Sequence, residues 1–178
     1  MSMRIEPATP DDVPEITAIY AHHVIHGTAT YELEPPDEAE MAERFATVAA
    51  AGGPWLVARG DGDELLGFAY ATQFRPRSAY RFTCENSVYV RNDRRGEGIG
   101  RALLALLLVQ AERAGFRQMI AVIGGAEPAS RRLHAACGFA DAGVLVATGR
   151  KHARWLDTLY MQRALGVEAD APPVEEPR

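Results

Sequence analysis

The stretch from residue 80 to residue 114 constrains the fold of this chain more than any other part. Apolar residues alternate up to Val90, a basic, glycine-rich segment follows, and a leucine-rich segment with helical spacing comes next. A strand should therefore lead through a short turn directly into a helix. Glycines at 96, 98 and 100 let a ligand approach the backbone, and free N–H groups in a helix's first turn bind anions. The segment predicts a pyrophosphate site.

Two common nucleotide-binding motifs do not fit this segment. A Walker A loop ends in Gly-Lys-Ser or Gly-Lys-Thr, which is absent, and a dinucleotide fingerprint needs G-x-G-x-x-G, whereas this run is G-x-G-x-G. The strands before it also resemble an antiparallel meander rather than a parallel unit. Taken alone, the segment also fits a glycine-rich connection with two solvated arginines.

The remaining periodicity is that of an α+β protein. Helical spacing predicts helices over residues 11–25, 37–51, 99–114 and 127–136. Two-residue alternation predicts strands over residues 3–6, 55–59, 65–74, 80–90, 118–123, 139–147 and 155–163. An antiparallel meander followed by a β-α-β crossover gives a mixed sheet with helices covering its faces.

Length and composition fit one domain. A chain of 178 residues, 47% of them apolar, is long enough to fold without metal or disulfide support. We place the domain at residues 1–165 and predict that the acidic, proline-rich tail at 166–178 is disordered. The net charge of −5 argues against nucleic acid or an anionic membrane as a partner.

Location and metal binding are also constrained. The first residues carry charges where a signal peptide needs an apolar stretch, and the longest apolar run is too short for a bilayer. A cytoplasmic location is expected. Cys84 and Cys137 stand far apart without a CxxC motif or a histidine cluster, so neither a metal nor a disulfide is expected.

Several motifs together resemble the GNAT N-acetyltransferases. The run Arg95-Gly-Glu-Gly-Ile-Gly100 fits the R/Q-x-x-G-x-G/A loop with which that family binds the pyrophosphate of acyl-CoA. Residues 121–124 and 130–139 are similar to the later strand, helix and Gly-Phe turn of its fold. Residues 85–90, 149–157 and 161–163 resemble the branch that acetylates phosphinothricin and methionine sulfoximine. The resemblance covers residues 3–164.

This resemblance implies a mixed, mostly antiparallel sheet that splays between central parallel strands at 79–90 and 118–123. Acetyl-CoA would lie in the opening, the acceptor amine would enter from the other side, and two copies would form a homodimer. The residues that the resemblance assigns to acetyl-CoA are Val88, Tyr89, Val90, Arg95, Gly96, Glu97, Gly98, Ile99, Gly100, Glu127 and Ser130. Family members usually have Asn where this chain has Glu127.

Acetyl transfer from a thioester requires a neutral amine, and the departing thiolate gains from a proton donor. Glu85 lies beside the expected acyl site and suits the general base, a role that the resemblance gives to the matching Glu. The structural alternative is a half-buried Glu85 paired with Arg81. Many family members have a Tyr that protonates the thiolate, and this branch has a histidine at that position, which His134 matches. The resemblance therefore implies that His134 is the proton donor; the alternative is that it is a packing residue.

Arginine suits carboxylate recognition because its guanidinium offers paired donors. Arg75 is the first candidate for reading a substrate α-carboxylate and Arg77 the second, since the branch has basic residues near both positions. The other expected substrate-site residues are Tyr31, Glu85, Asn86 and Ser87. The histidines at 22, 23 and 26 have no carboxylates at ligand spacing and are interpreted as structural.

The sequence therefore favours an acetyl-CoA-dependent N-acetyltransferase acting by direct transfer. Its expected substrate is the α-amino group of a small amino acid analogue, either phosphinothricin or methionine sulfoximine or sulfone. One alternative is acetylation of a protein or peptide N-terminus, which would need a more open groove and no carboxylate-reading arginine. The other is a non-catalytic sensor that binds acetyl-CoA and leaves its thioester intact.

Overall fold

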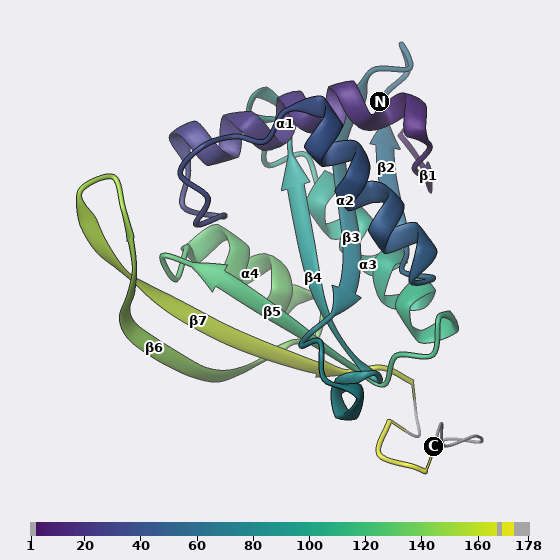
Figure 1. Cartoon of the computed structure of the whole chain (residues 1–178), viewed down its shortest axis with the longest axis vertical. Helices are drawn as coiled ribbons and strands as arrows, with labels where there is room; N and C mark the ends of the chain where they lie inside the picture. The colour runs from purple at the N-terminus through teal and green to yellow at the C-terminus, as the bar shows by residue number, and fades with distance from the viewer. Residues whose placement is uncertain (1–2, 167–168, 173–178) are drawn as a thin grey trace.

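The structure of the chain is a computed structural model that describes residues 3–166 and 169–172. Its strands are β1 (Arg4–Pro7), β2 (Trp55–Arg59), β3 (Leu65–Gln73), β4 (Thr83–Val90), β5 (Gln118–Gly124), β6 (Ala140–Lys151) and β7 (Arg154–Ala164). Its α-helices are α1 (Val13–His26), α2 (Glu38–Ala50), α3 (Ile99–Arg113) and α4 (Pro128–Ala136) (Figure 1). Most of the tail predicted at 166–178 lies outside the described residues.

These strands form one sheet in the order β1-β2-β3-β4-β5-β7-β6. Neighbouring strands run antiparallel, except for β4 and β5, which run parallel. Helix α3 lies between β4 and β5 in the chain, and parallel neighbours need such a crossover connection. The predicted mixed, mostly antiparallel sheet with a central parallel pair is confirmed.

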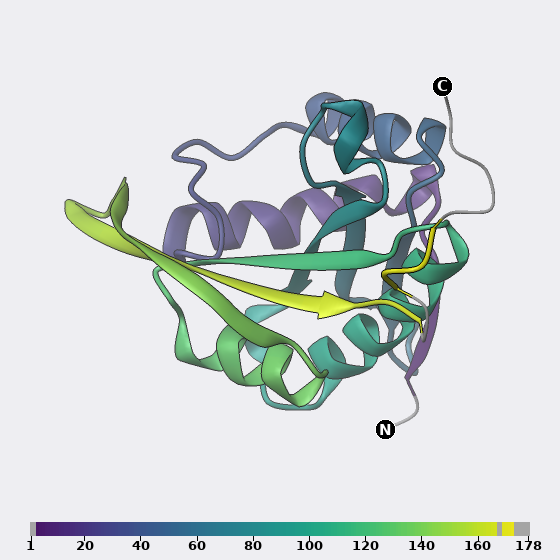
Figure 2. The ribbon, with the colours of Figure 1, turned by 90° about the horizontal axis from the view of Figure 1, so that it is seen from below.

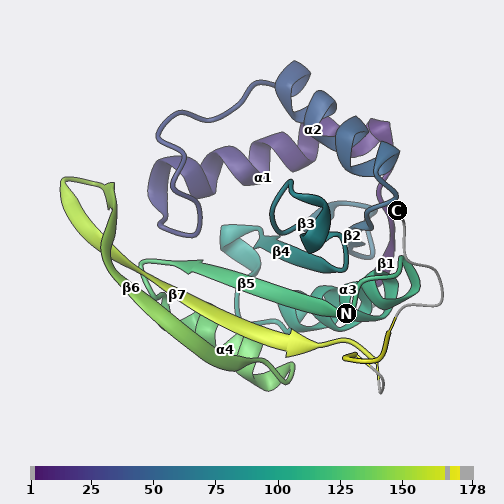
Figure 3. The ribbon, with the colours of Figure 1, turned by 60° about the horizontal axis from the view of Figure 1, so that its bottom comes forward.

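Helices cover both faces of this sheet. Figure 3 shows α1 and α2 on one face and α3 and α4 on the other. The strands supply each face with alternate residues. In β2, Trp55 and Val57 belong to the core under α1 and α2, whereas Leu56 and Ala58 belong to the core that contains the leucines of α3. The sheet is thus fixed between two apolar layers.

The predicted strand boundaries differ from the structure mainly at β4 and in the β6–β7 hairpin. Strand β4 begins at Thr83 rather than at residue 80, because Ser78–Tyr80 forms a short 3₁₀ helix. Strand β6 continues to Lys151 and β7 begins at Arg154, which leaves a two-residue turn at His152 and Ala153. Both turn residues have positive φ, 50° and 60°. Asn and Gly are the usual residues in such turns, so His152 and Ala153 carry no turn signal.

The β6–β7 hairpin contacts the loop between α1 and α2 (residues 27–37). The hairpin is long and curved and lies at one edge of the sheet (Figure 2). Lys151 Nζ donates a hydrogen bond of 2.8 Å to the Thr30 carbonyl, and His152 Nε2 lies 3.2 Å from the Gly27 carbonyl. The hairpin turn therefore holds the loop in place.

Among residues 3–166 and 169–172, no helix is long and apolar enough to cross a membrane. The same residues contain no group of three or more His, Cys, Asp or Glu side chains that could hold a metal ion. Cys84 and Cys137 are free and buried.

Candidate functional site

A cavity opens where the two parallel strands separate. Pairing between β4 and β5 runs from Thr83 with Gln118 to Asn86 with Ala121 and extends no further. The cavity has a volume of about 290 Å³ and is lined by residues 85–89 of β4 and 121–124 of β5. The predicted splay of the sheet is therefore present, and it creates a hollow in the middle of the molecule.

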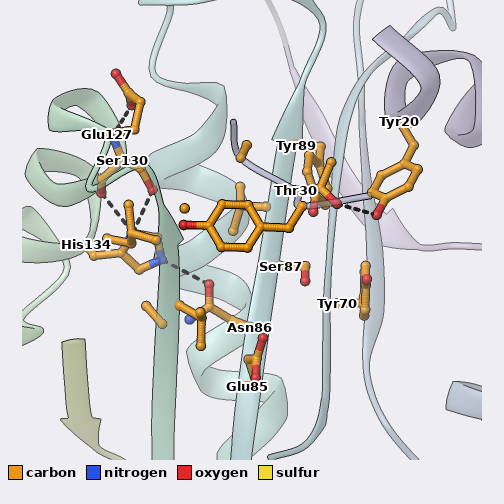
Figure 4. A pocket seen from close by; sticks show the side chains of 17 residues that line it. Tyr20, Thr30, Tyr70, Glu85, Asn86, Ser87, Tyr89, Glu127, Ser130 and His134 are labelled. Atoms are coloured by element: carbon orange, nitrogen blue, oxygen red, sulfur yellow. Dashed lines mark hydrogen bonds between the residues drawn. The ribbon is translucent and has the colours of Figure 1, made fainter. Parts of the chain in front are cut away.

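The two walls of the cavity carry different groups. Figure 4 shows Glu127, Ser130 and His134 on one side, and Tyr20, Thr30 and Tyr70 on the other. Glu85, Asn86 and Ser87 follow one another along β4 between these walls. One wall comes from α4 and the other from α1, β3 and the 27–37 loop.

The hydrogen bonds of β4 show which backbone groups face the opening. The Thr83 carbonyl accepts from Phe74 N, and Arg91 N donates to the Leu66 carbonyl, so odd-numbered residues direct these groups toward the β3 side. Even-numbered residues point the opposite way, toward β5. Beyond Asn86 there is no β5 partner. The N–H and C=O groups of Val88 and Val90 therefore face the opening, as a site for an extended polar ligand requires.

The glycine loop (residues 95–100) leads into α3. Gly96 and Gly98 have φ of +82° and +83°, and nothing lies within 4 Å of a Cβ built on either residue. Gly98 is the N-cap of α3, a helix of 15 residues. Positive φ and open space let an anion approach the backbone N–H groups and the helix N-terminus. The predicted pyrophosphate site has the geometry that such an anion needs.

The other residues of the glycine loop differ in their exposure and contacts. The Arg95 side chain is exposed, whereas the Ile99 side chain is 2% exposed and packs in the core. The Glu97 carboxylate accepts from Arg94 Nε at 3.0 Å. A Cβ on Gly100 would lie 3.4 Å from Leu133 and 3.5 Å from Val90. Arg95 is thus the loop side chain that is free to meet an anion, while Gly100 permits close packing.

Glu85 is half-buried and lines the cavity. Burial raises the pKa of its carboxyl group, and the positive charge of Arg75 partly opposes this rise. Within the described residues Glu85 has no ion-pair partner, so the alternative pairing with Arg81 is not formed. A carboxylate with a raised pKa and no partner is suited to accept a proton.

His134 is 5% exposed, and acceptor oxygens face both of its ring nitrogens. Nδ1 lies 2.8 Å from the Ser130 carbonyl and Nε2 lies 2.9 Å from Asn86 Oδ1. Asn86 Nδ2 donates to the Ile120 carbonyl at 3.1 Å, which leaves Oδ1 as the group that faces His134. Burial lowers the pKa of His134, and the hydrogen bond with Ser130 opposes this. His134 and Asn86 therefore form a buried polar link between α4, β4 and β5.

Three other predicted residues, Tyr89, Glu127 and Ser130, line the cavity and also have structural contacts. Tyr89 is buried, and its ring packs edge-to-face against Tyr20. Glu127 is the N-cap of α4, where its side chain accepts from Ser130 N at 2.8 Å. Its carboxylate thus does for the helix what an amide oxygen would do. Both Glu127 and Ser130 also line the cavity.

The predicted substrate residues do not all reach the cavity. Arg75 and Arg77 are exposed and do not line it; the Arg75 guanidinium lies over the Phe74 ring, 4.1 Å from its centroid. Tyr31 does line it, and its hydroxyl is held by Thr158 Oγ1 at 2.8 Å and by Gly125 N at 3.1 Å. Tyr31 thus fastens the 27–37 loop beside the cavity.

Sequence reasoning missed the wall formed by Tyr20, Thr30 and Tyr70. Tyr20 Oη lies 2.9 Å from both Thr30 Oγ1 and Glu32 Oε1, and burial raises the Tyr20 pKa to about 12. Arg44 in turn donates to Glu32. In the sequence these residues look like ordinary members of a helix, a loop and a strand. Their meeting depends on how the loop folds back.

Comparisons with known proteins identify acetyltransferases as relatives of this chain. The model of the acetyltransferase (GNAT) family matches residues 17–139. The chain is 57% identical over 156 residues to a phosphinothricin N-acetyltransferase of Alcaligenes faecalis, covering 87% of this chain and 79% of that protein. It is 40% identical over 172 residues to an L-methionine sulfoximine/L-methionine sulfone acetyltransferase of Pseudomonas aeruginosa, covering 97% and 100%.

Solved structures give a similar result. The crystal structure of a phosphinothricin acetyltransferase from Sinorhizobium meliloti in complex with acetyl-CoA superposes with a TM-score of 0.96. The two sequences are 50% identical, and the match covers 98% of this chain and 95% of that one. The similarity thus includes both sheet halves and the glycine loop.

Proposed function

This chain belongs to the GNAT acetyltransferase family, and we propose that it transfers the acetyl group of acetyl-CoA to the α-amino group of a small amino acid analogue such as phosphinothricin or methionine sulfoximine. The observation that carries the proposal is the opening between β4 and β5. It has Glu85 at the paired end of the strands and the glycine loop beyond their separated ends.

The described residues fit acetyl-CoA. Gly96 and Gly98 leave an open approach to the α3 N-terminus for a pyrophosphate, with Arg95 beside it. The backbone N–H and C=O groups of Val88 and the N–H of Val90, which face the opening, suit the amide groups of a pantetheine arm. When bound, acetyl-CoA supplies an acetyl group activated as a thioester. The donor would thus run along the separated part of β4.

Glu85 is proposed as the base. It accepts a proton from the substrate ammonium group, directly or through a water, so that the nitrogen can attack the acetyl carbon. The new C–N bond forms as the C–S bond breaks, with no covalent enzyme intermediate. The raised pKa of Glu85 supports this role because a carboxylic acid with an ordinary pKa is a weak base near neutral pH.

His134 is proposed to supply the proton that the departing thiolate takes up. Its Nδ1 lies 3.5 Å from the hydroxyl of Ser130, which lines the cavity and offers a path for that proton. Acceptors at both ring nitrogens stabilise the protonated ring, while burial opposes it. A ring held between these two tendencies can release a proton without a large energetic cost.

Arg75 stays our candidate for the substrate carboxylate, with Arg77 second. The positive charge of Arg75 lowers the pKa of the Glu85 carboxyl, which supports this role although Arg75 does not itself line the cavity. Tyr31, Asn86 and Ser87 line the same cavity. A small amino acid would thus meet a positive charge beside the base.

We also propose that two copies associate through the β6 edge. Val144, Leu145 and Val146 are 51%, 48% and 75% exposed, and Trp155 on the adjacent β7 is 62% exposed. Large exposed apolar side chains on an edge strand support an interface. Light scattering of the purified protein tests this, and Val146→Lys should favour the monomer. The cytoplasmic location stays a prediction.

The proposed substrate class is tested with an acceptor panel. Free thiol released from acetyl-CoA is measured with phosphinothricin, methionine sulfoximine, methionine sulfone, common amino acids and short peptides. We expect kcat/KM to be highest for one of the small analogues. Higher values for peptides would favour the N-terminal acetyltransferase alternative instead.

A further inference from the structure

His23 lies on α1, outside the set of residues assigned above to the cavity. It is 6% exposed, and its Nε2 lies 2.9 Å from the carbonyl oxygen of Val90. A carbonyl can only accept, so Nε2 carries the ring proton and donates it. This hydrogen bond joins the first helix to the last residue of β4.

The carbonyl that His23 binds is one of the groups that face the opening. Val90 is even-numbered, and even-numbered residues of β4 direct their backbone groups away from β3. Without a β5 partner at this height, the carbonyl needs another donor. His23 supplies it, and the N–H of Val90 and both groups of Val88 remain for a ligand.

The second ring nitrogen faces the glycine loop. With the proton on Nε2, Nδ1 has a free lone pair, and Arg95 Nη2 lies 3.5 Å from it, at the long limit for a hydrogen bond. Burial lowers the pKa of His23, the hydrogen bond with Val90 opposes this, and the charges of Arg95, His22 and Lys151 lower the pKa further. A lowered pKa favours the neutral ring, in which the Nδ1 lone pair is available. The Tyr89 ring, 5.3 Å away between centroids, packs beside it.

We propose that His23 is a positioning residue for the acyl donor, connecting the end of the strand that faces the pantetheine arm to the arginine that faces the pyrophosphate. The inference rests on the proposed function, because it concerns how acetyl-CoA is held. Through Nε2, His23 fixes the last residue of β4. Through Nδ1, it orients Arg95, whose side chain is otherwise exposed.

Two acetyl donors distinguish the contact of His23 with Val90 from its contact with Arg95. Acetylpantetheine has the thioester and the pantetheine arm but no pyrophosphate, so only acetyl-CoA depends on Arg95. In His23→Gln, the amide nitrogen can still donate to Val90. The amide oxygen can accept, but it is bonded to Cδ rather than to Cγ, so it does not take the place of Nδ1 beside Arg95. We expect KM for acetyl-CoA to rise about three- to tenfold, with kcat nearly unchanged and acetylpantetheine little affected.

His23→Phe keeps the ring contact with Tyr89 and loses both hydrogen bonds, so it should impair both donors. His22→Phe, one position away on the same helix, is the matched control and should impair neither. When Arg95 is already replaced by Ala, His23→Gln should raise KM for acetyl-CoA less than twofold. This double-mutant comparison remains decisive if His23→Phe does not fold.

The outcomes distinguish the inference from the function on which it rests. If the wild-type enzyme uses neither donor, or does not prefer acetyl-CoA, the proposed function or its pyrophosphate site is wrong. If the wild type prefers acetyl-CoA but His23→Gln changes both donors equally, or changes neither, His23 does not orient Arg95. Full additivity of His23→Gln and Arg95→Ala would also overturn the inference.

Discussion

The imidazole of His134 meets the side-chain amide of Asn86 at the point where β4 and β5 part. Nε2 and Oδ1 are 2.9 Å apart, and Asn86 forms the last register pair between the two strands, with Ala121. Because Asn86 also donates to the Ile120 carbonyl, one buried side chain joins β4 to β5 and to α4. The position of the opening therefore depends on a polar link as well as on the apolar cores.

Replacing Asn86 with Leu keeps the approximate volume and removes both hydrogen bonds. The Ile120 carbonyl and the His134 ring lose their partners inside the protein, so we expect the free energy of unfolding to fall by about 1–3 kcal/mol. Urea denaturation followed by circular dichroism measures it. Asn92→Leu, at an exposed position, is the control, and an equal loss in both variants would contradict the link.

Replacing Glu85 with Gln keeps the shape of the side chain and removes the base. We expect kcat to fall about 10²- to 10⁴-fold, with acetyl-CoA binding retained. In the wild type, kcat/KM should fall as the pH drops through the raised pKa of Glu85, because the protonated carboxyl cannot act as a base. The residual activity of Glu85→Gln should not show this fall at low pH.

Glu85→Gln should lower activity but raise the stability of the fold. A carboxyl group whose pKa is higher in the folded than in the unfolded state destabilises the fold when it is ionised. The free energy of unfolding should therefore be higher for Glu85→Gln than for the wild type near neutral pH. The difference should disappear below about pH 4, the pKa of a glutamate carboxyl in the unfolded chain. Near wild-type turnover at all pH values would rule out Glu85 as the base.

The glycine loop is tested with two glycines at opposite ends of α3. Gly98 and Gly115 both have positive φ, +83° and +96°, with nothing within 4 Å of an added Cβ. Valine at either position should cause comparable backbone strain, but only Gly98→Val places a side chain where the pyrophosphate would bind. At a hundredfold excess over Kd, acetyl-CoA should stabilise wild type and Gly115→Val by about 2.7 kcal/mol.

Gly98→Val should lose most of that stabilisation, which appears as a smaller ligand-induced rise in Tm. Both variants are compared without ligand first, so that their intrinsic stability is known. Equal ligand-induced shifts in the two variants would show that the pyrophosphate binds elsewhere.

Local patterns predicted the elements well because each one is encoded by nearby residues. The glycine loop is the clearest case, since its strand, turn and helix follow one another in the sequence. The β6–β7 turn was missed because His152 and Ala153 adopt positive φ without a glycine or asparagine. Long-range packing, in which Lys151 and His152 hold the 27–37 loop, makes that conformation possible.

The candidate site was only partly predictable. Strand periodicity placed Glu85 and Val88 on one strand, and the resemblance to the GNAT family assigned them to the site. The wall with Tyr20 and Thr30 depends instead on a loop that folds back. His23 was interpreted as structural because it has no carboxylates at ligand spacing. Its partner is a backbone carbonyl, and no pattern of side chains in the sequence reveals such a contact.

Arg75 is tested by comparing acid and amide substrates. If its guanidinium binds the substrate carboxylate, Arg75→Ala should lower kcat/KM about 10- to 100-fold for the amino acid and hardly at all for its amide. Arg75→Lys should recover little, because an ammonium group lacks the paired donors. Arg77→Ala is the control. An equal loss with acid and amide would make Arg75 a scaffold residue.

The most direct test of the proposed function is to follow acetyl transfer by wild type and Glu85→Gln in parallel. Each enzyme is incubated with acetyl-CoA and either phosphinothricin or methionine sulfoximine, while released thiol is recorded and the product is identified by mass spectrometry and NMR. We predict that the wild type releases one thiol for each substrate molecule acetylated on its α-nitrogen, and that Glu85→Gln binds acetyl-CoA but is at least about a hundredfold slower. Stabilisation by acetyl-CoA with no thiol released from the wild type, for either substrate or for any other amine, would contradict the account and indicate an acyl-CoA-binding protein without turnover.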